Sequence, residues 1–184
     1  MQMFEFGENR DHEPRCKTNH YVICENHQRL AVLEQKYNLT PLFIFTFVRN
    51  PYDRIKSWFF YHQSNQLYKN TTLNEWIKNG CKTHWKRQNE TNWGEESPLL
   101  QYNFIKSNTR VDFIGKIESF ETDCKRLIHI LNDLFQKNNL PKEITYKPIQ
   151  ENQSIQHTEE ISEENKTLIY KMFQKDFEYF GYDA

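Results

Sequence analysis

The clearest pattern along the chain is an almost unbroken apolar run at residues 42–48, which leads directly into a helical pattern. Such a run, interrupted only by Thr46, is typical of a central strand that is buried on both faces of a parallel sheet. It ends at Arg49, Asn50 and Pro51, where Asn50 can cap a helix and Pro51 suits its first position. The pattern therefore predicts a strand followed at once by a helix.

The helix predicted after Pro51 has two different faces. At 100° per residue, one face is aromatic and apolar and the opposite face is polar. The apolar face carries Tyr52, Ile55, Trp58, Phe59 and His62, and the polar face carries Asn50, Asp53 and Ser57. We expect the apolar face to pack into the core, with His62 as a packed residue. We expect the polar face to look toward the carboxyl end of the strand.

The order of strand and then helix repeats further along the chain. VDFIG at residues 111–115 predicts a second buried strand, and Ser119 is a candidate cap of a long amphipathic helix. The other predicted helices are a connecting helix at about 29–37, a short one over 72–79 stopped by Gly80, one from Ser97-Pro98 to about Lys106, and a last one from Ser162 through Phe177 closed near Gly181. This alternation predicts an α/β architecture in one continuous unit.

The composition limits which ligands the whole surface can attract. The 184 residues include 24 Lys and Arg against 25 Asp and Glu, giving a net charge of −1. No global field therefore draws the chain to nucleic acid or to an anionic membrane, and an anionic ligand needs a local site. The apolar run at 42–48 is much shorter than the roughly 20 residues of a membrane helix. The four cysteines lack the spacing of a metal site, so we interpret them as ordinary thiols.

The junction between the first strand and its helix predicts a local anion site. The carboxyl end of a parallel strand faces a ligand crevice, and the following helix offers free backbone N–H groups. Arg49 adds a planar fork suited to phosphate, and Ser57 adds a hydroxyl two turns into the helix. The alternative is that Arg49 pairs with Asp53 or Glu118 while Ser57 only faces solvent.

Three segments, in order, resemble parts of the sulfotransferase family, in particular its carbohydrate type. FTFVRNPYDRIKS at residues 45–57 resembles the element of that family that binds a 3′-phosphate. VDFIGKIESFETDCKRL at 111–127 resembles the second strand and the acidic helix start. The segment 152–183, which ends in DFEYFGYD, resembles the family's tail. The resemblance therefore extends from about residue 42 to residue 183.

This resemblance implies a P-loop-like, three-layer α/β fold with a parallel sheet flanked by helices. It also implies transfer of a sulfuryl group from 3′-phosphoadenosine-5′-phosphosulfate (PAPS) to a hydroxyl of a carbohydrate-like acceptor, without a metal. By the resemblance, Arg49 and Ser57 hold the 3′-phosphate of the nucleotide. We expect Asn50 to belong to the same nucleotide-binding site. The expected organisation is a single domain over 1–184, with a connecting region at 1–41 and a family-like core at 42–184.

Sulfuryl transfer needs a base on the acceptor hydroxyl, and family members commonly place a His or an acidic residue ahead of the strand that ends in Arg. His20 is the first candidate by its position before the connecting helix, and His12 is the second. For each of them, the alternative is a surface histidine without a catalytic role.

One expected part of the family pattern is missing from the sequence. The family begins with a strand and a phosphate loop of Gly, Lys and Ser or Thr, but Gly7 is the only glycine before Leu42. We therefore expect the fold to lack its first strand and that loop. The chain is then either truncated, which we favour because the loss of a central strand exposes sheet edges, or no longer able to bind the donor well. We expect a soluble chain, cytoplasmic if complete, and Golgi-luminal or membrane-anchored if an upstream segment is missing.

Three functions remain open from the sequence. The first is a sulfotransferase that uses PAPS and a glycan or other hydroxyl-bearing acceptor. The second is a catalytically inactive binding module, and the third is a nucleotide-binding protein of other function, for which the charge balance disfavours nucleic acid. The loop at 81–96, with tryptophans among basic residues, suits either ligand contact or a solvated loop. Gln101 and Glu118 lie near where family members line their clefts.

Overall fold

The structure is a computed structural model that describes residues 28–63, 68, 70–82, 97, 99–140, 143–148 and 158–184. Helices and strands alternate in this part of the chain, as the sequence predicts. In chain order the elements are α1 (Leu30–Lys36), β1 (Phe45–Val48), α2 (Pro51–Gln63), α3 (Leu73–Lys78), α4 (Tyr102–Ile105), β2 (Phe113–Lys116), the 3₁₀ turn η2 (Ile117–Ser119), α5 (Phe120–Lys137) and α6 (Glu163–Phe180).

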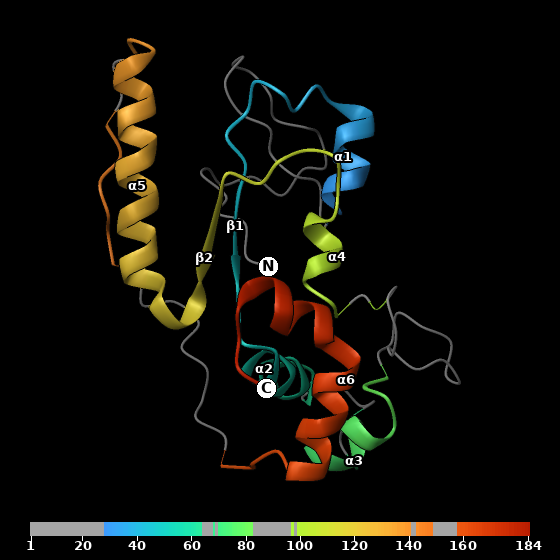
Figure 1. The fold of residues 1–184 in the computed structure, drawn as a ribbon. Coiled ribbons are helices and arrows are strands. Elements are labelled where there is room, and N and C mark those ends of the chain that lie inside the picture. Colours follow the sequence, from blue (N-terminus) through green and yellow to red (C-terminus); the bar gives the residue numbers. More distant parts are fainter. Residues whose placement is uncertain are drawn as a thin grey trace.

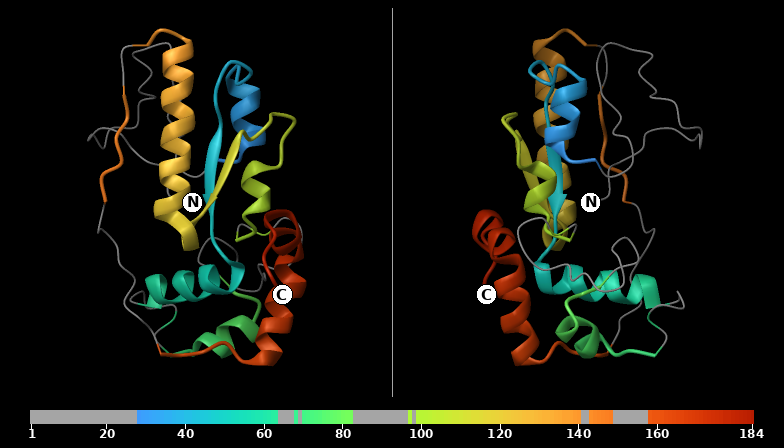
Figure 2. Two further views of the ribbon diagram at one scale, coloured as in Figure 1. Left: turned by 60° about the vertical axis from the view of Figure 1, so that its left-hand side comes forward. Right: turned by 90° about the vertical axis from the view of Figure 1, so that its right-hand side faces the viewer.

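The two strands pair in parallel, with Phe45 opposite Phe113 and Val48 opposite Lys116. Helix α5 runs beside β2, while α1 and α4 lie on the other side of the strands (Figure 1). Figure 2 shows that α2, α3 and α6 form a separate group beyond the carboxyl ends of both strands. The fold is therefore α/β, with a small parallel sheet flanked by helices, as predicted. Each strand ends facing the helices of this group.

The first strand is shorter than the predicted 42–48 but is buried as expected. Thr46, Phe47 and Val48 are all buried, whereas Phe45 at the start of β1 is 38% exposed. Before the strand, the Ile44 N–H donates to a carboxylate oxygen of Asp112 at 2.9 Å, in place of a backbone acceptor. The Asp112 side chain thus replaces a backbone partner just ahead of the ladder.

The prediction that a helix starts at Ser97 was wrong, because the helix of this region, α4, covers only Tyr102–Ile105. The Ser97 hydroxyl accepts the Leu99 N–H at 3.1 Å, and the Ser97 carbonyl accepts from the Asn103 amide at 3.1 Å. Ser97 therefore caps a turn. The last helix extends beyond the predicted Phe177 to Phe180, and Gly181 ends it in the left-handed region with φ of +63°.

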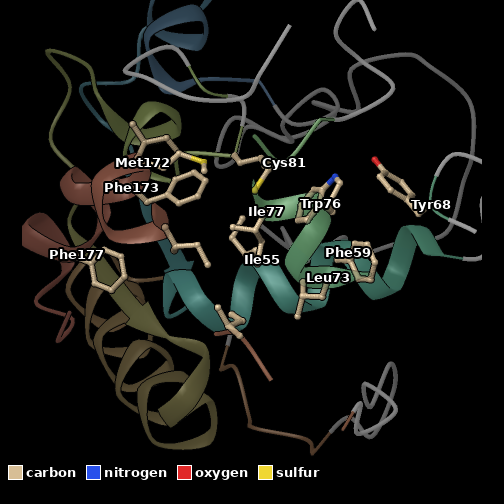
Figure 3. Close-up of a cluster of buried hydrophobic side chains, with 14 residues drawn as sticks. Ile55, Phe59, Tyr68, Leu73, Trp76, Ile77, Cys81, Met172, Phe173 and Phe177 are labelled. Atoms are coloured by element: carbon tan, nitrogen blue, oxygen red, sulfur yellow. The ribbon is translucent and has the colours of Figure 1, made fainter. Parts of the chain in front are cut away.

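The main core forms where α2, α3 and α6 meet (Figure 3). The predicted apolar face of α2 lies in this core, with Ile55 and Phe59 almost fully buried. His62 is buried beside the rings of Trp58 and Tyr68, which confirms its predicted packing role. Since the core covers this side of α2, the polar face of the helix is directed away from it.

Close packing of the two strands makes Gly115→Ala a test of the sheet. A Cβ at Gly115 would overlap the aromatic ring of Phe47, which lies opposite it in the ladder. We expect the substitution to lower the free energy of unfolding by about 1–3 kcal/mol, measured by urea denaturation. A second change, Phe47→Leu, should recover part of the loss in the Gly115→Ala background. Equal stability of Gly115→Ala and wild type would contradict the packing described.

Candidate functional site

The connection between β1 and α2 consists of only two residues, Arg49 and Asn50. The Asn50 side-chain oxygen accepts the Tyr52 N–H at 2.9 Å, and its carbonyl accepts the Arg54 N–H at 2.8 Å. Asn50 therefore caps α2, as the sequence predicts. Its side-chain oxygen is used by its own helix, which makes it a positioning group at this junction.

Gln101 holds the backbone of Arg49 on both sides of the residue. The Arg49 N–H donates to Gln101 Oε1 at 2.9 Å, and Gln101 Nε2 donates to the Arg49 carbonyl at 2.7 Å. The Arg49 side chain is half-buried, and its guanidinium has no hydrogen bond or ion pair with any residue that the structure describes. The alternative pairing with Asp53 or Glu118 is not formed.

Ser57 lies on the polar face of α2, two helical turns after Asn50, and is half-buried. At 3.6 residues per turn, positions 50 and 57 lie on the same side of the helix, and a rise of about 1.5 Å per residue separates them by about 10 Å along its axis. Within the described ranges, the Ser57 hydroxyl has no hydrogen-bond partner. Ser57 therefore lies on the outward face of the helix that follows Arg49.

A second arginine, Arg54, lies half-buried beneath this junction. Its guanidinium donates to the Leu99 carbonyl. The pKa of Arg54 is lowered to about 10, mainly by burial; the carboxylate of Asp176 opposes this shift, and the positive charge of Arg49 adds to it. The two guanidinium groups are thus close enough to interact electrostatically. They bring two cationic side chains to the carboxyl end of β1, where Asp176 and Glu118 supply carboxylates.

Asp176 of α6 is the acceptor at the centre of the buried contacts, with 1% of its surface exposed. Its two carboxylate oxygens accept the backbone N–H groups of Gln101 at 2.9 Å and of Tyr102 at 2.7 Å. Burial raises the pKa of Asp176, while these hydrogen bonds and Arg54 act in the opposite direction. Asp176 thereby connects the C-terminal helix to the segment that holds Arg49.

The end of the chain also returns to the strand ends (Figure 1). One carboxylate oxygen of Glu118 accepts the Asn50 N–H at 2.6 Å, and the other accepts the Tyr182 hydroxyl at 3.0 Å. Lys116 donates to the Gly181 carbonyl at 3.1 Å, and its ammonium lies 4.2 Å from the centroid of the Tyr182 ring. Burial and the neighbouring Glu118 raise the pKa of Tyr182.

The sequence did not single out Arg54 or Asp176, and it placed Gln101 and Glu118 only near a cleft. A signal for Asp176 was present, since it lies on the apolar stripe of α6. That stripe consists of Asn165, Ile169, Met172, Phe173, Asp176, Phe177 and Phe180. The predicted bases, His12 and His20, and most of the loop at 81–96 lie outside the described residues.

Asp123 fixes the end of β2 from the first turn of α5. Its carboxylate accepts the Lys116 N–H at 2.8 Å, the Ser119 hydroxyl at 2.7 Å and a guanidinium N–H of Arg126 at 3.0 Å. Ser119 occupies the predicted cap position, but its hydroxyl donates to Asp123 instead of accepting from the helix. Burial tends to raise the pKa of Asp123, but these hydrogen bonds together lower it.

The lowered pKa of Asp123 gives a pH-dependent contribution to stability. Because the folded pKa lies below the unfolded value of about 3.9, this contribution is present above that pH and is lost as the pH falls through the folded pKa. We expect Asp123→Asn to lower the free energy of unfolding by about 1–3 kcal/mol at pH 7. Urea titrations should show that this difference shrinks below about pH 4. A difference that does not depend on pH would contradict the assignment.

In the ranges that the structure describes, no three His, Cys, Asp or Glu residues are grouped so as to hold a metal ion. Cys81 and Cys124 are buried, and burial raises the pKa of both thiols. No helix in the described part of the chain is long and apolar enough to cross a membrane.

Comparison with known proteins identifies one family. A family profile described as "Sulfotransferase family" matches residues 3–183, which is nearly the whole chain. Searches among curated proteins and among solved structures returned no match. The match includes both strands, the β1–α2 junction and α6.

Proposed function

Because the chain belongs to the sulfotransferase family, we propose that it transfers a sulfuryl group from PAPS to a hydroxyl of a carbohydrate-like acceptor. The observation that carries this proposal is the β1–α2 junction. It presents the Arg49 guanidinium where β1 ends and the Ser57 hydroxyl on the outward face of the helix that follows. In this proposal, both groups bind the 3′-phosphate of the nucleotide, and Asn50 shapes the junction.

The physical fit of this junction to a phosphate supports the proposal. A guanidinium can donate two parallel hydrogen bonds to a phosphate dianion, and a hydroxyl can add a third. A phosphate dianion would also relieve the repulsion between the guanidinium groups of Arg49 and Arg54, because it attracts both of them. Catalysis of group transfer then depends mainly on holding the nucleotide and the acceptor in line.

The proposed reaction exchanges one bond to sulfur for another. The acceptor oxygen forms a bond to the sulfur atom of PAPS, while the bond from that sulfur to the 5′-phosphate oxygen breaks. A base removes the acceptor's hydroxyl proton, and adenosine 3′,5′-bisphosphate leaves. His20 is our first candidate for this base and His12 the second.

Binding of adenosine 3′,5′-bisphosphate tests the role of the junction. We expect Arg49→Ala to weaken this binding about 10- to 100-fold, because hydrogen bonds to charged groups each contribute about 1.5–3 kcal/mol. Ser57→Ala should weaken it about tenfold, because its single hydroxyl hydrogen bond lies at the low end of that range. Isothermal titration calorimetry measures both dissociation constants.

The matched control is Arg110→Ala. Arg110 is an exposed arginine ahead of β2, where it pairs with Asp112. Its loss should leave the affinity for adenosine 3′,5′-bisphosphate within about twofold of wild type. Arg49→Ala with unchanged affinity, or an equal loss in Arg110→Ala, would refute the proposed phosphate site.

Transfer of labelled sulfate from PAPS to a panel of glycans tests the reaction and its base. We expect His20→Gln to lower kcat about 100-fold or more, because a general base contributes about 10²–10⁴ in rate. The affinity for adenosine 3′,5′-bisphosphate should not change. His12→Gln is the parallel variant, and wild-type rates in both would exclude these histidines. A wild-type chain that binds the nucleotide but transfers no sulfate would instead be a binding module.

A further inference from the structure

We propose that Gln101 is a positioning residue for Arg49, and that through Asp176 it makes nucleotide binding depend on helix α6. This inference rests on the proposed function, because it assigns a nucleotide phosphate to Arg49. It adds to that function a link between the phosphate site and the C-terminal helix. Gln101 itself does not need to touch the nucleotide.

Gln101 bonds to the backbone of Arg49, just where the strand ladder ends. The ladder between the two strands ends with Val48 opposite Lys116, so Arg49 is the first residue of this segment beyond it. The Gln101 carboxamide supplies one acceptor and one donor to the backbone of Arg49, at 2.9 Å and 2.7 Å. A carboxamide thus continues the backbone pairing where the sheet stops. This fixes the direction from which the Arg49 side chain leaves the backbone.

Asp176 fixes the orientation of the Gln101 carboxamide. Gln101 Nε2 also donates to a carboxylate oxygen of Asp176 at 3.3 Å, so its two hydrogens point to two acceptors. A flipped carboxamide would place its oxygen against the Asp176 carboxylate and its NH₂ group against the Arg49 N–H. Asp176 therefore selects the one orientation that suits both backbone groups of Arg49.

The network of Gln101 and Asp176 is also buried. Gln101 is 8% exposed and Asp176 1% exposed. Asp176 also accepts the backbone N–H groups of Gln101 and Tyr102, which fixes the segment itself to α6. Supporting groups of this kind hold a binding side chain to within a fraction of an ångström, and their loss weakens binding without removing any ligand contact.

The experiment is a double-mutant cycle on the affinity for adenosine 3′,5′-bisphosphate, measured by titration calorimetry. Gln101→Met keeps the size of the side chain but removes both of its polar groups. We expect it to weaken binding about 5- to 50-fold in the wild-type background and less than about twofold in the Arg49→Ala background. Gln174→Met is the matched control, since Gln174 is an exposed glutamine on α6 that bonds only to Glu178 among the described residues.

A second readout needs no nucleotide. Hydrogen exchange at the Arg49 backbone N–H should become about tenfold faster or more in Gln101→Met, because the acceptor of that N–H is gone. Exchange within the core of α5 should stay as in wild type. The hydrogen-exchange measurement separates the two proposals. A wild-type chain that fails to bind the nucleotide refutes the proposed function. The exchange rate of the Arg49 N–H still decides whether Gln101 holds Arg49.

Two results would overturn the inference. One is a Gln101→Met chain whose affinity and Arg49 exchange rate equal those of wild type. The other is a loss of affinity that is as large in the Arg49→Ala background as in wild type, which would indicate a general structural effect. If Gln101→Met does not fold, Gln101→Asn provides the same comparison, because its carboxamide is one methylene too short to span the two groups of Arg49.

Discussion

When a helix begins only two residues after a buried strand, the N–H and C=O groups of the connection lack the backbone hydrogen-bond partners that a strand or a helix would supply. At Arg49 and Asn50 the strand ladder has ended and the helix has not yet formed its regular hydrogen bonds. Backbone groups in this position need partners, because unpaired ones are costly when water is excluded. Side chains supply them: Gln101 serves Arg49, and Glu118 serves the N–H of Asn50. This requirement determines which other segments must gather at the strand ends.

Both of these side chains are in turn held by the last part of the chain. Asp176 anchors Gln101 from α6, and Tyr182 donates its hydroxyl to Glu118. The proposed anion site is therefore built by contacts between segments that are far apart in the sequence, and only its proposed ligand-binding groups come from the strand–helix unit. The same contacts place the buried carboxylate of Asp176 where it interacts with Arg54, so part of the positive charge at the junction is balanced.

Features that depend on neighbouring residues could be predicted from the sequence. The buried strand, the Asn50 cap, the short helix ahead of Gly80 and the stop at Gly181 follow from local pattern and turn chemistry, and the structure confirms them. Ser97 shows the limit of such reasoning, since a cap residue followed by proline serves a turn as well as a helix. The contacts that support the proposed site could not be predicted. Gln101 reaches Arg49, and Asp176 reaches Gln101, only through tertiary packing. The phosphate-binding role of Arg49 and Ser57 and the catalytic role of His12 or His20 stay predictions.

The order of these segments along the chain also has a consequence for biosynthesis. Translation completes β1 and α2 long before β2, and both strands before α6 and Tyr182. A nascent chain therefore lacks part of the proposed phosphate site until α6 has left the ribosome tunnel. Pairing of the two strands, with residues 49–112 between them, must also wait for closure of a long loop. Completion of the proposed site is thus a late event in synthesis, set by the emergence of α6, although its ligand-binding groups are made early.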